Sequence, residues 1–344
     1  MIKRILYTLL IMFPVLASAQ INTDRVMAIG RNALYFEDYV LSIQYFNQVI
    51  NAKPYLSDPY FYRGLAKINL DDFQGAESDC SEAIERNPFV VSAYQVRGLA
   101  RIQQNNFAGA IEDYTKALEF DPENIGVWHN MALCRIRQED YKGAKNDLDK
   151  LIAISPRYTK AYLMRGEVDL KQKDTLAAEK DFGKAIEIDR YDADTWASRA
   201  ILRLQQQRYK DAEADFDHAI RLSTRNSGVY INRALARYHQ NNLRGAMSDY
   251  DIALDIDPNN FIGHYNRGLL RAQVGDDNRA IQDFNFVIEM EPDNMMAIFN
   301  RGLLLDQTGD YKGAIKDYST VINEYPNFLL GYQYRAQARR KIGD

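Results

Sequence analysis

Arginine and aspartate each recur along the chain at a step of 34 residues, and we call each such set of equivalent residues a column. Their charged side chains are the residues of this chain best suited to binding or catalysis. The first column is arginine: Arg63, Arg97, Arg165, Arg199, Arg233, Arg267, Arg301 and Arg335. The second column is aspartate: Asp79, Asp113, Asp147, Asp181, Asp215, Asp249, Asp283 and Asp317. A guanidinium and a carboxylate can form two parallel charge-assisted hydrogen bonds. The matched step predicts that each arginine pairs with the aspartate of its own repeat. The alternative is an arginine row that binds an anionic ligand.

A third basic column follows four residues after the first. Its members are Arg101, Arg135, Arg203, Arg237, Arg271 and Arg339. No acidic column matches it as regularly as the aspartates match the first arginines. We therefore expect these side chains to make exposed contacts.

The residue types that usually carry catalysis do not gather in the sequence. The four histidines, His129, His218, His239 and His264, are scattered, and none has metal-ligand spacing to another histidine or a cysteine. There is no Gly-rich phosphate loop and no nucleophile elbow. The many Asp and Glu residues fall on repeating positions, which is typical of a solvated face. We predict no enzymatic activity, no cofactor and no metal.

Charge balance also restricts the partner. The chain has 43 basic and 47 acidic residues, a formal net charge of −4. Proteins that bind nucleic acid rely on a basic face to contact phosphates. The balance argues against a nucleic-acid partner.

The elements that hold the charged columns are repeats of two amphipathic segments. Within each repeat apolar residues recur at three- and four-residue spacing, which is helical. The eighth position is small throughout: Gly30, Gly64, Gly98, Ala132, Gly166, Ala200, Ala234, Gly268, Gly302 and Ala336. The twentieth position is Ala in most repeats, and the twenty-fourth is large and apolar in most. Small residues let two antiparallel helices approach closely, and the bulky residue fills the space beside that contact.

This pattern resembles the tetratricopeptide repeat, which has a helix–turn–helix period of 34 residues, Gly or Ala at position 8, Ala at 20, an aromatic residue at 24 and Pro at 32. The resemblance implies an all-α fold, a right-handed superhelical solenoid of antiparallel helix pairs. Residues 20–344 would form the solenoid. Its nine full units would be 23–56, 57–90, 91–124, 125–158, 159–192, 193–226, 227–260, 261–294 and 295–328, followed by a half unit at 329–344.

The resemblance also implies where a partner would bind. In this family the first helix of each unit lines the concave surface, at positions 2, 5, 6, 9, 12 and 13. Apolar residues at these positions form the predicted protein-binding site: Phe61, Leu65, Ile68, Leu99, Ile102, Leu235, Tyr238, Tyr265, Leu269, Phe299 and Leu303. The sequence leaves open whether this column is a groove that faces solvent or is covered by helix packing.

The N-terminus has the features of a secretory signal peptide. Lys3 and Arg4 form a basic head, an apolar run follows, and Ala17-Ser18-Ala19 supplies the small residues of a cleavage site. The apolar run is shorter than the ~20 residues that span a bilayer. We expect cleavage after Ala19, a periplasmic or secreted protein, and no membrane insertion after cleavage.

These observations together predict a non-catalytic scaffold that binds a peptide or a helix of another protein on its concave face. The alternative is the N-terminal scaffold region of a larger exported enzyme or sensor, because the half unit at 329–344 stops where the other units turn into their second helix. A third hypothesis is that the protein self-assembles through that incomplete unit. The identity of the partner and the oligomeric state stay open.

Overall fold

The computed structural model describes residues 22–223 and 225–344, so the predicted signal peptide and its cleavage point lie outside the described residues. The described ranges contain nineteen α-helices and no strand. Their bounds are α1 Thr23–Tyr35, α2 Tyr39–Ala52, α3 Asp58–Ile68, α4 Phe73–Arg86, α5 Val91–Gln103, α6 Phe107–Phe120, α7 Ile125–Arg137, α8 Tyr141–Ile154, α9 Thr159–Lys171, α10 Thr175–Ile188, α11 Ala193–Gln205, α12 Tyr209–Leu222, α13 Ser227–His239, α14 Leu243–Ile256, α15 Phe261–Gln273, α16 Asp277–Met290, α17 Met295–Thr308, α18 Tyr311–Glu324 and α19 Leu329–Ile342. The predicted all-α class and the pairing of helices are confirmed.

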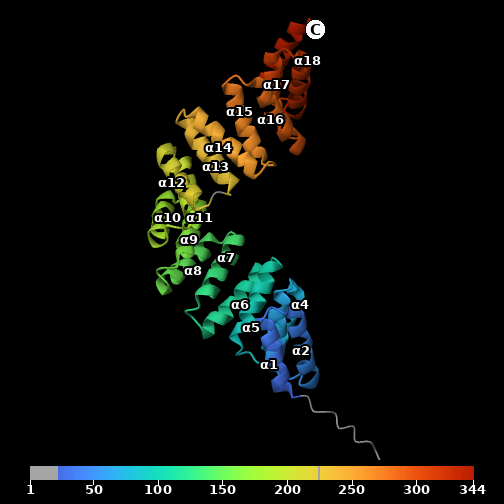
Figure 1. Cartoon of the computed structure of the whole chain (residues 1–344), viewed down its shortest axis with the longest axis vertical. Coiled ribbons are helices and arrows are strands. Elements are labelled where there is room, and N and C mark those ends of the chain that lie inside the picture. The colour runs from blue at the N-terminus through green and yellow to red at the C-terminus, as the bar shows by residue number, and fades with distance from the viewer. Residues whose placement is uncertain (1–21, 224) are drawn as a thin grey trace, which may run out of the picture. The chain divides into compact units, whose positions relative to one another are not determined.

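Successive helices pack as pairs, α1 with α2, α3 with α4 and so on to α17 with α18 (Figure 1). The chain forms two compact units, one ending at Pro156 and the other beginning at Arg157. Within a unit, each second helix also packs on the first helix of the next pair, as α4 does on α5 and α16 on α17. No described helix is long and apolar enough to cross a bilayer.

Each turn between the two helices of a pair is built from the same two positions. The first takes a left-handed backbone conformation, as Asn105 does with φ 58° and Gly309 with φ 95°. In most turns the next residue caps the second helix with its side chain, as Asn106 Oδ1 does by accepting a hydrogen bond from the backbone N–H of Gly109 at 3.1 Å. Arg208 and Asp276 make no such bond. Such a cap satisfies a backbone donor that the helix itself leaves unpaired. An aspartate or asparagine at the second position therefore begins the second helix in most repeats.

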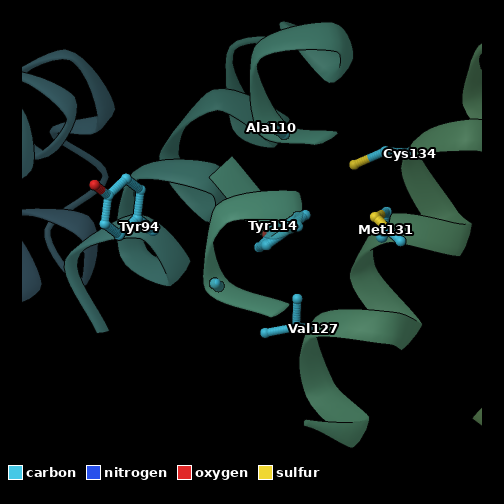
Figure 2. Close-up of a cluster of buried hydrophobic side chains, with 7 residues drawn as sticks. Tyr94, Ala110, Tyr114, Val127, Met131 and Cys134 are labelled. Atoms are coloured by element: carbon cyan, nitrogen blue, oxygen red, sulfur yellow. The ribbon is translucent and has the colours of Figure 1, made fainter. Parts of the chain in front are cut away.

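The small residues at the eighth position set the distance between the paired helices. A methyl group added to Gly98 would lie 2.8 Å from the ring of Tyr114, which is closer than side chains tolerate. Tyr114 is fully buried and packs with Val127 and Met131 of the next pair, so one core runs from pair to pair within the unit (Figure 2).

Candidate functional site

The predicted pairing of arginines with aspartates is present. We call the row of arginine–aspartate pairs the ladder, and each pair a rung. In a representative rung, Arg233 of α13 donates from Nε to Asp249 Oδ2 at 2.9 Å and from Nη2 to Oδ1 at 2.6 Å. The same pairing joins Arg63–Asp79, Arg97–Asp113, Arg165–Asp181, Arg199–Asp215, Arg233–Asp249, Arg267–Asp283 and Arg301–Asp317. The aspartates are buried and the arginines are largely covered. These arginines are therefore part of the scaffold and do not form a free anion-binding row.

Many of the ladder arginines also reach back to the preceding repeat. The Nη1 group of Arg233 donates to Asp217 of α12 at 2.6 Å, and that of Arg267 donates to Asp251 of α14 at 2.8 Å. Asn47, Ser81, Asn285 and Ser319 accept the equivalent bond elsewhere. One guanidinium thus ties the second helices of two consecutive repeats together. The polar residues at the twenty-fifth position were the sequence signal for this contact.

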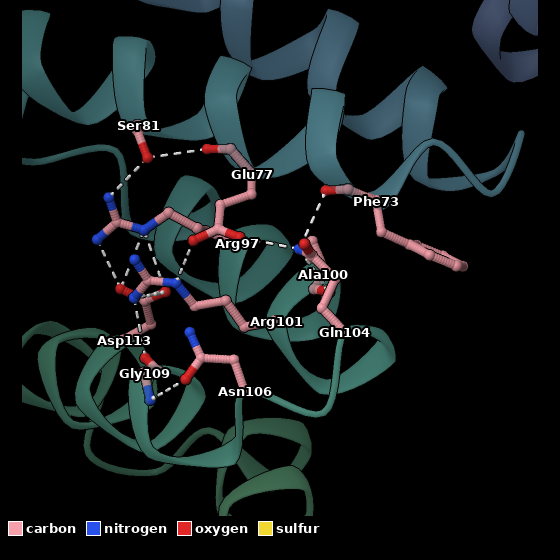
Figure 3. A network of polar contacts seen from close by, with 10 residues as sticks. All are labelled: Phe73, Glu77, Ser81, Arg97, Ala100, Arg101, Gln104, Asn106, Gly109 and Asp113. Atoms are coloured by element: carbon pink, nitrogen blue, oxygen red, sulfur yellow. Dashed lines mark hydrogen bonds and ion pairs between the residues drawn. The ribbon is translucent and has the colours of Figure 1, made fainter.

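The expectation that the third basic column makes exposed contacts holds for Arg339, whose side chain is 47% exposed, and is wrong for the other five arginines. Arg101 donates to Asp113 Oδ2 at 3.0 Å and to Glu77 Oε1 at 2.8 Å, beside Arg97 (Figure 3). Arg203 and Arg237 repeat this arrangement. The glutamate partner, Glu77 in the case of Arg101, lies in the previous repeat, so this second ion pair crosses a repeat boundary. Two arginines therefore converge on each of these buried aspartates.

The electrostatics of a complete rung favour the charged form of its arginine. Burial disfavours the charged form of Arg233, but its hydrogen bonds with Asp249 and that carboxylate's charge outweigh burial, so the pKa of Arg233 lies above its ordinary value. Arg97 and Arg267 show the same balance with Asp113 and Asp283. The two charged groups of a complete rung are bonded to each other and mostly covered, so their role is to stabilise the packing of the helices.

One rung is incomplete. Met131 stands where the ladder arginine would be, so within the described ranges Arg135 is the one basic partner of Asp147, with its Nε 2.9 Å from Asp147 Oδ2. These two atoms do not align as a hydrogen bond. Burial raises the pKa of Asp147 to about 6; the charge of Arg135 lowers it only in part, and Asp140 adds to the rise.

The residues predicted for the binding site divide by exposure. Leu99 and Leu269 are exposed. The half-buried members are Phe61, Leu65, Ile68, Ile102, Leu235, Tyr238, Tyr265 and Leu303. Among these, Phe61, Ile102, Tyr238, Tyr265 and Leu303 also pack against the cores of the helix pairs. The apolar column is therefore partly core and partly accessible.

Phe299 is the member that does not fit a solvent-facing groove. Its side chain is only 8% exposed and packs edge-to-face on Phe328, with the two ring centroids 5.0 Å apart. It also contacts the rings of Tyr318 and Tyr334. The turn before α19 folds over this position, and this cover made Phe299 a core residue.

The second position of the last repeats adds apolar surface that the sequence-based prediction missed. Ile262 is 51% exposed, Met296 is 59% exposed and Leu330 is 49% exposed. On a helix the second and ninth positions lie seven residues apart on one face. We define the apolar strip as Ile262 and Leu269 of α15, Met296 and Leu303 of α17, and Leu330 of α19.

The three helices of the strip are neighbours. α15 contacts α17, and α17 contacts α19. The Asn300 side-chain amide donates to the Tyr265 hydroxyl at 3.2 Å, which fixes α17 against α15. The strip is therefore a continuous feature of the unit that begins at Arg157.

A cavity of about 400 Å³ opens beside Met296. Met295, Met296, Phe299, Val321, Tyr325 and Phe328 supply its apolar lining, and Asp293 and Asn294 its polar part. A cavity of this size and lining can hold a large apolar side chain. The described residues contain no cluster of His, Cys, Asp and Glu that could hold a metal ion.

Comparison with known sequences identifies the repeat. Sequence models of the TPR repeat match residues 98–134, and models of the tetratricopeptide repeat match residues 125–158, 159–192, 198–261 and 265–327. The chain is a tetratricopeptide repeat protein. A search of curated protein sequences found no match.

Solved tetratricopeptide repeat structures share the fold of this chain. A tetratricopeptide repeat protein from Parabacteroides merdae aligns with a TM-score of 0.55 and 21% identity, over 72% of this chain and 98% of its own. The C-terminal part of a TPR repeat-containing protein from Cytophaga hutchinsonii aligns with a TM-score of 0.56 and 17% identity, over 69% and 97%. PilF of Pseudomonas aeruginosa aligns with a TM-score of 0.53 and 19% identity, over 63% and 97%. At these identities the likeness concerns the fold.

The tetratricopeptide repeat supports a protein-interaction scaffold, and it is typically non-catalytic. Within this fold, function depends on the side chains carried by the scaffold.

Proposed function

We propose that this tetratricopeptide repeat protein binds an extended or helical segment of another protein on the apolar strip, without catalysing a reaction. The observation that carries the proposal is the exposure of large apolar side chains at equivalent positions of three neighbouring helices. Exposed apolar surface of this regularity marks interaction sites in soluble proteins. The partner would present apolar side chains along one side.

The rigidity of the scaffold supports this mode of binding. Complete rungs hold α15 and α17 on their second helices, and the core that contains Phe299 holds α19. Little conformational entropy is therefore lost on the scaffold side when a partner binds. Met296 at the edge of the cavity has a flexible thioether side chain that adapts to the shape of an inserted group. The cavity would take one apolar anchor of the partner, and the strip would take its neighbours.

Capture of the native partner tests the proposal. The full chain would be used to retain proteins from the native envelope fraction, beside a variant with Leu269→Glu and Met296→Glu. A charged carboxylate on the strip must be desolvated when the partner binds, so we expect at least about 30-fold weaker binding by the variant.

Leu176→Glu is the matched control, because Leu176 is exposed on the second helix α10, away from the strip. Circular dichroism would confirm that all variants fold. A partner bound equally well by the strip variant and the control would contradict a site on the strip.

We also propose that the protein is exported to the periplasm or secreted after cleavage behind Ala19. The basic head, apolar run and small residues of the N-terminus support the proposal. Intact mass of the native protein tests it: the expected mature chain begins at Gln20. A native protein that retains Met1 would contradict export by this route.

A further inference from the structure

The cavity beside Met296 is lined by two segments of the chain that lack basic residues. Residues 285–300 include the start of α17, and residues 319–334 include the end of α18 and the start of α19. Neither segment contains Lys, Arg or His. Together they contain four acidic residues: Glu289, Glu291, Asp293 and Glu324. The chain around the cavity therefore carries only negative charge.

Asp293 brings one of these carboxylates to the cavity itself. It is an exposed residue of the turn before α17, and it lines the cavity with Asn294 and Met296. The side chain of Asn294 is used by the fold, because it accepts a hydrogen bond from the backbone N–H of Ala297 at 3.0 Å and donates one to Glu291 at 3.1 Å. Among the ion pairs of residues 22–223 and 225–344, none involves Asp293. Its carboxylate is available to a partner.

The lining of the cavity suits an apolar group that lies next to a cation. The rings of Phe299, Tyr325 and Phe328 contribute to the lining, and the faces of aromatic rings attract the charged groups of lysine and arginine. The N-terminus of α17 opposes a cation with a partial positive charge of roughly half a unit, which is smaller than the charge of one carboxylate. The cavity therefore offers apolar contact and negative charge at adjacent points.

The positions of Asp293 and Met296 are open in interior repeats as well. Ile262 stands one repeat before Met296, and it is 51% exposed although another helix pair follows its own. Phe89 and Tyr191 occupy the position of Asp293 in earlier repeats, and each is 73% exposed. These positions are therefore accessible where a further repeat follows.

We propose that this cavity takes a large apolar side chain of a basic segment, and that a lysine or arginine next to that side chain pairs with Asp293. The inference rests on the proposed function and gives the charge class of its partner. The apolar side chain contributes most of the affinity, because it leaves water when it enters the cavity. The charge selects among apolar segments, since a basic segment meets opposite charges there and an acidic segment meets like charges.

Three synthetic peptides test the charge preference. They share one row of apolar residues with a central phenylalanine, and they differ at three other positions, which are all arginine, all glutamine or all glutamate. Binding to the full chain would be followed by fluorescence anisotropy. We expect the arginine peptide to bind at least about 10-fold more tightly than the glutamate peptide, with the glutamine peptide between them. Raising the salt concentration from about 0.05 M to about 0.5 M should weaken the arginine peptide several-fold and the glutamine peptide little.

Charge reversal in the protein identifies the carboxylate. Asp293→Lys should weaken binding of the arginine peptide about 10-fold, because an attraction becomes a repulsion, and should leave the glutamine peptide within about twofold. Asp255→Lys is the matched control, since Asp255 is an exposed residue of α14 outside the cavity lining. It should leave all three peptides within about twofold. Circular dichroism would confirm that both variants fold.

Three results would overturn the inference. One is absence of saturable binding by the arginine peptide, and another is equal binding of the arginine and glutamate peptides. The third is an arginine peptide that binds Asp293→Lys as tightly as the wild-type protein.

The captured native partner separates this inference from the strip proposal. A partner that is lost by the Leu269→Glu and Met296→Glu variant, but retained by Asp293→Lys and at high salt, would support the strip and overturn the basic class. A partner retained by the Leu269→Glu and Met296→Glu variant would contradict the strip itself.

Discussion

Replacing Arg233 with alanine is expected to lower the free energy of unfolding by about 3 kcal/mol. Arg233 holds Asp249 in its own repeat and Asp217 in the preceding one. Asp249 is 1% exposed, so the substitution leaves a buried carboxylate with only one arginine, Arg237, at 2.8 Å. Because Arg237 stays paired with Asp249, we expect the loss in the free energy of unfolding to lie near the lower end of the range for removing one partner of a buried ion pair. Chemical denaturation followed by circular dichroism measures the change.

The ladder itself provides the matched control. Arg335→Ala makes the same substitution in the same column, where no described carboxylate is bonded, and should change stability by about 0.5 kcal/mol or less. The double variant Arg233→Met with Asp249→Leu removes both buried charges and should recover most of the loss. Equal effects of Arg233→Ala and Arg335→Ala would contradict a stabilising role of the aspartate pair.

Replacing Asp147 with asparagine is expected to stabilise the protein by about 1–2 kcal/mol near pH 8 and to have little effect near pH 4. The pKa of Asp147 is raised from 3.8 to about 6 in the folded state. The folded state therefore binds a proton more tightly than the unfolded state, and stability falls as the pH rises from about 4 to about 6. Above that window the wild-type protein buries an ionised carboxylate beside a misaligned Arg135. Asparagine removes that charge, so the difference between the variants should grow with pH.

Asp113→Asn is the control for this pH dependence. Asp113 occupies the same position of the previous repeat, but it accepts hydrogen bonds from both Arg97 and Arg101. Its replacement should destabilise the protein near pH 8 by about 2 kcal/mol, the opposite sign to Asp147→Asn. Parallel stability profiles of wild type and Asp147→Asn between pH 4 and pH 8 would contradict the raised pKa.

Local periodicity was enough to predict the helices, their pairing and the complete rungs. Arg97 and Asp113 lie on the two helices of one repeat, so the sequence of a single 34-residue unit is enough to predict that they pair. The turns at Asn105-Asn106 and Gly309-Asp310 were predictable for the same reason, because backbone conformation and capping depend on adjacent residues.

Features that depend on neighbouring repeats were not predictable in this way. Arg101 finds Glu77 across a repeat boundary, and only the packed structure shows that their side chains meet. Phe299 has the periodicity of a groove residue, but Phe328 covers it from the turn before α19. The exposure of Met296 depends on how α17 lies against α15 and α19. Tertiary contacts, rather than residue type, separate core from surface at these positions.

Hydrogen–deuterium exchange of the full chain with and without its captured partner tests the central claim most directly. A partner on the apolar strip should slow amide exchange in α15, α17 and the start of α19, which carry Leu269, Met296 and Leu330. The second helices α16 and α18 should change less, since they carry none of the strip residues. Protection concentrated in α16 and α18, with unchanged exchange in α15 and α17, would contradict binding on the strip.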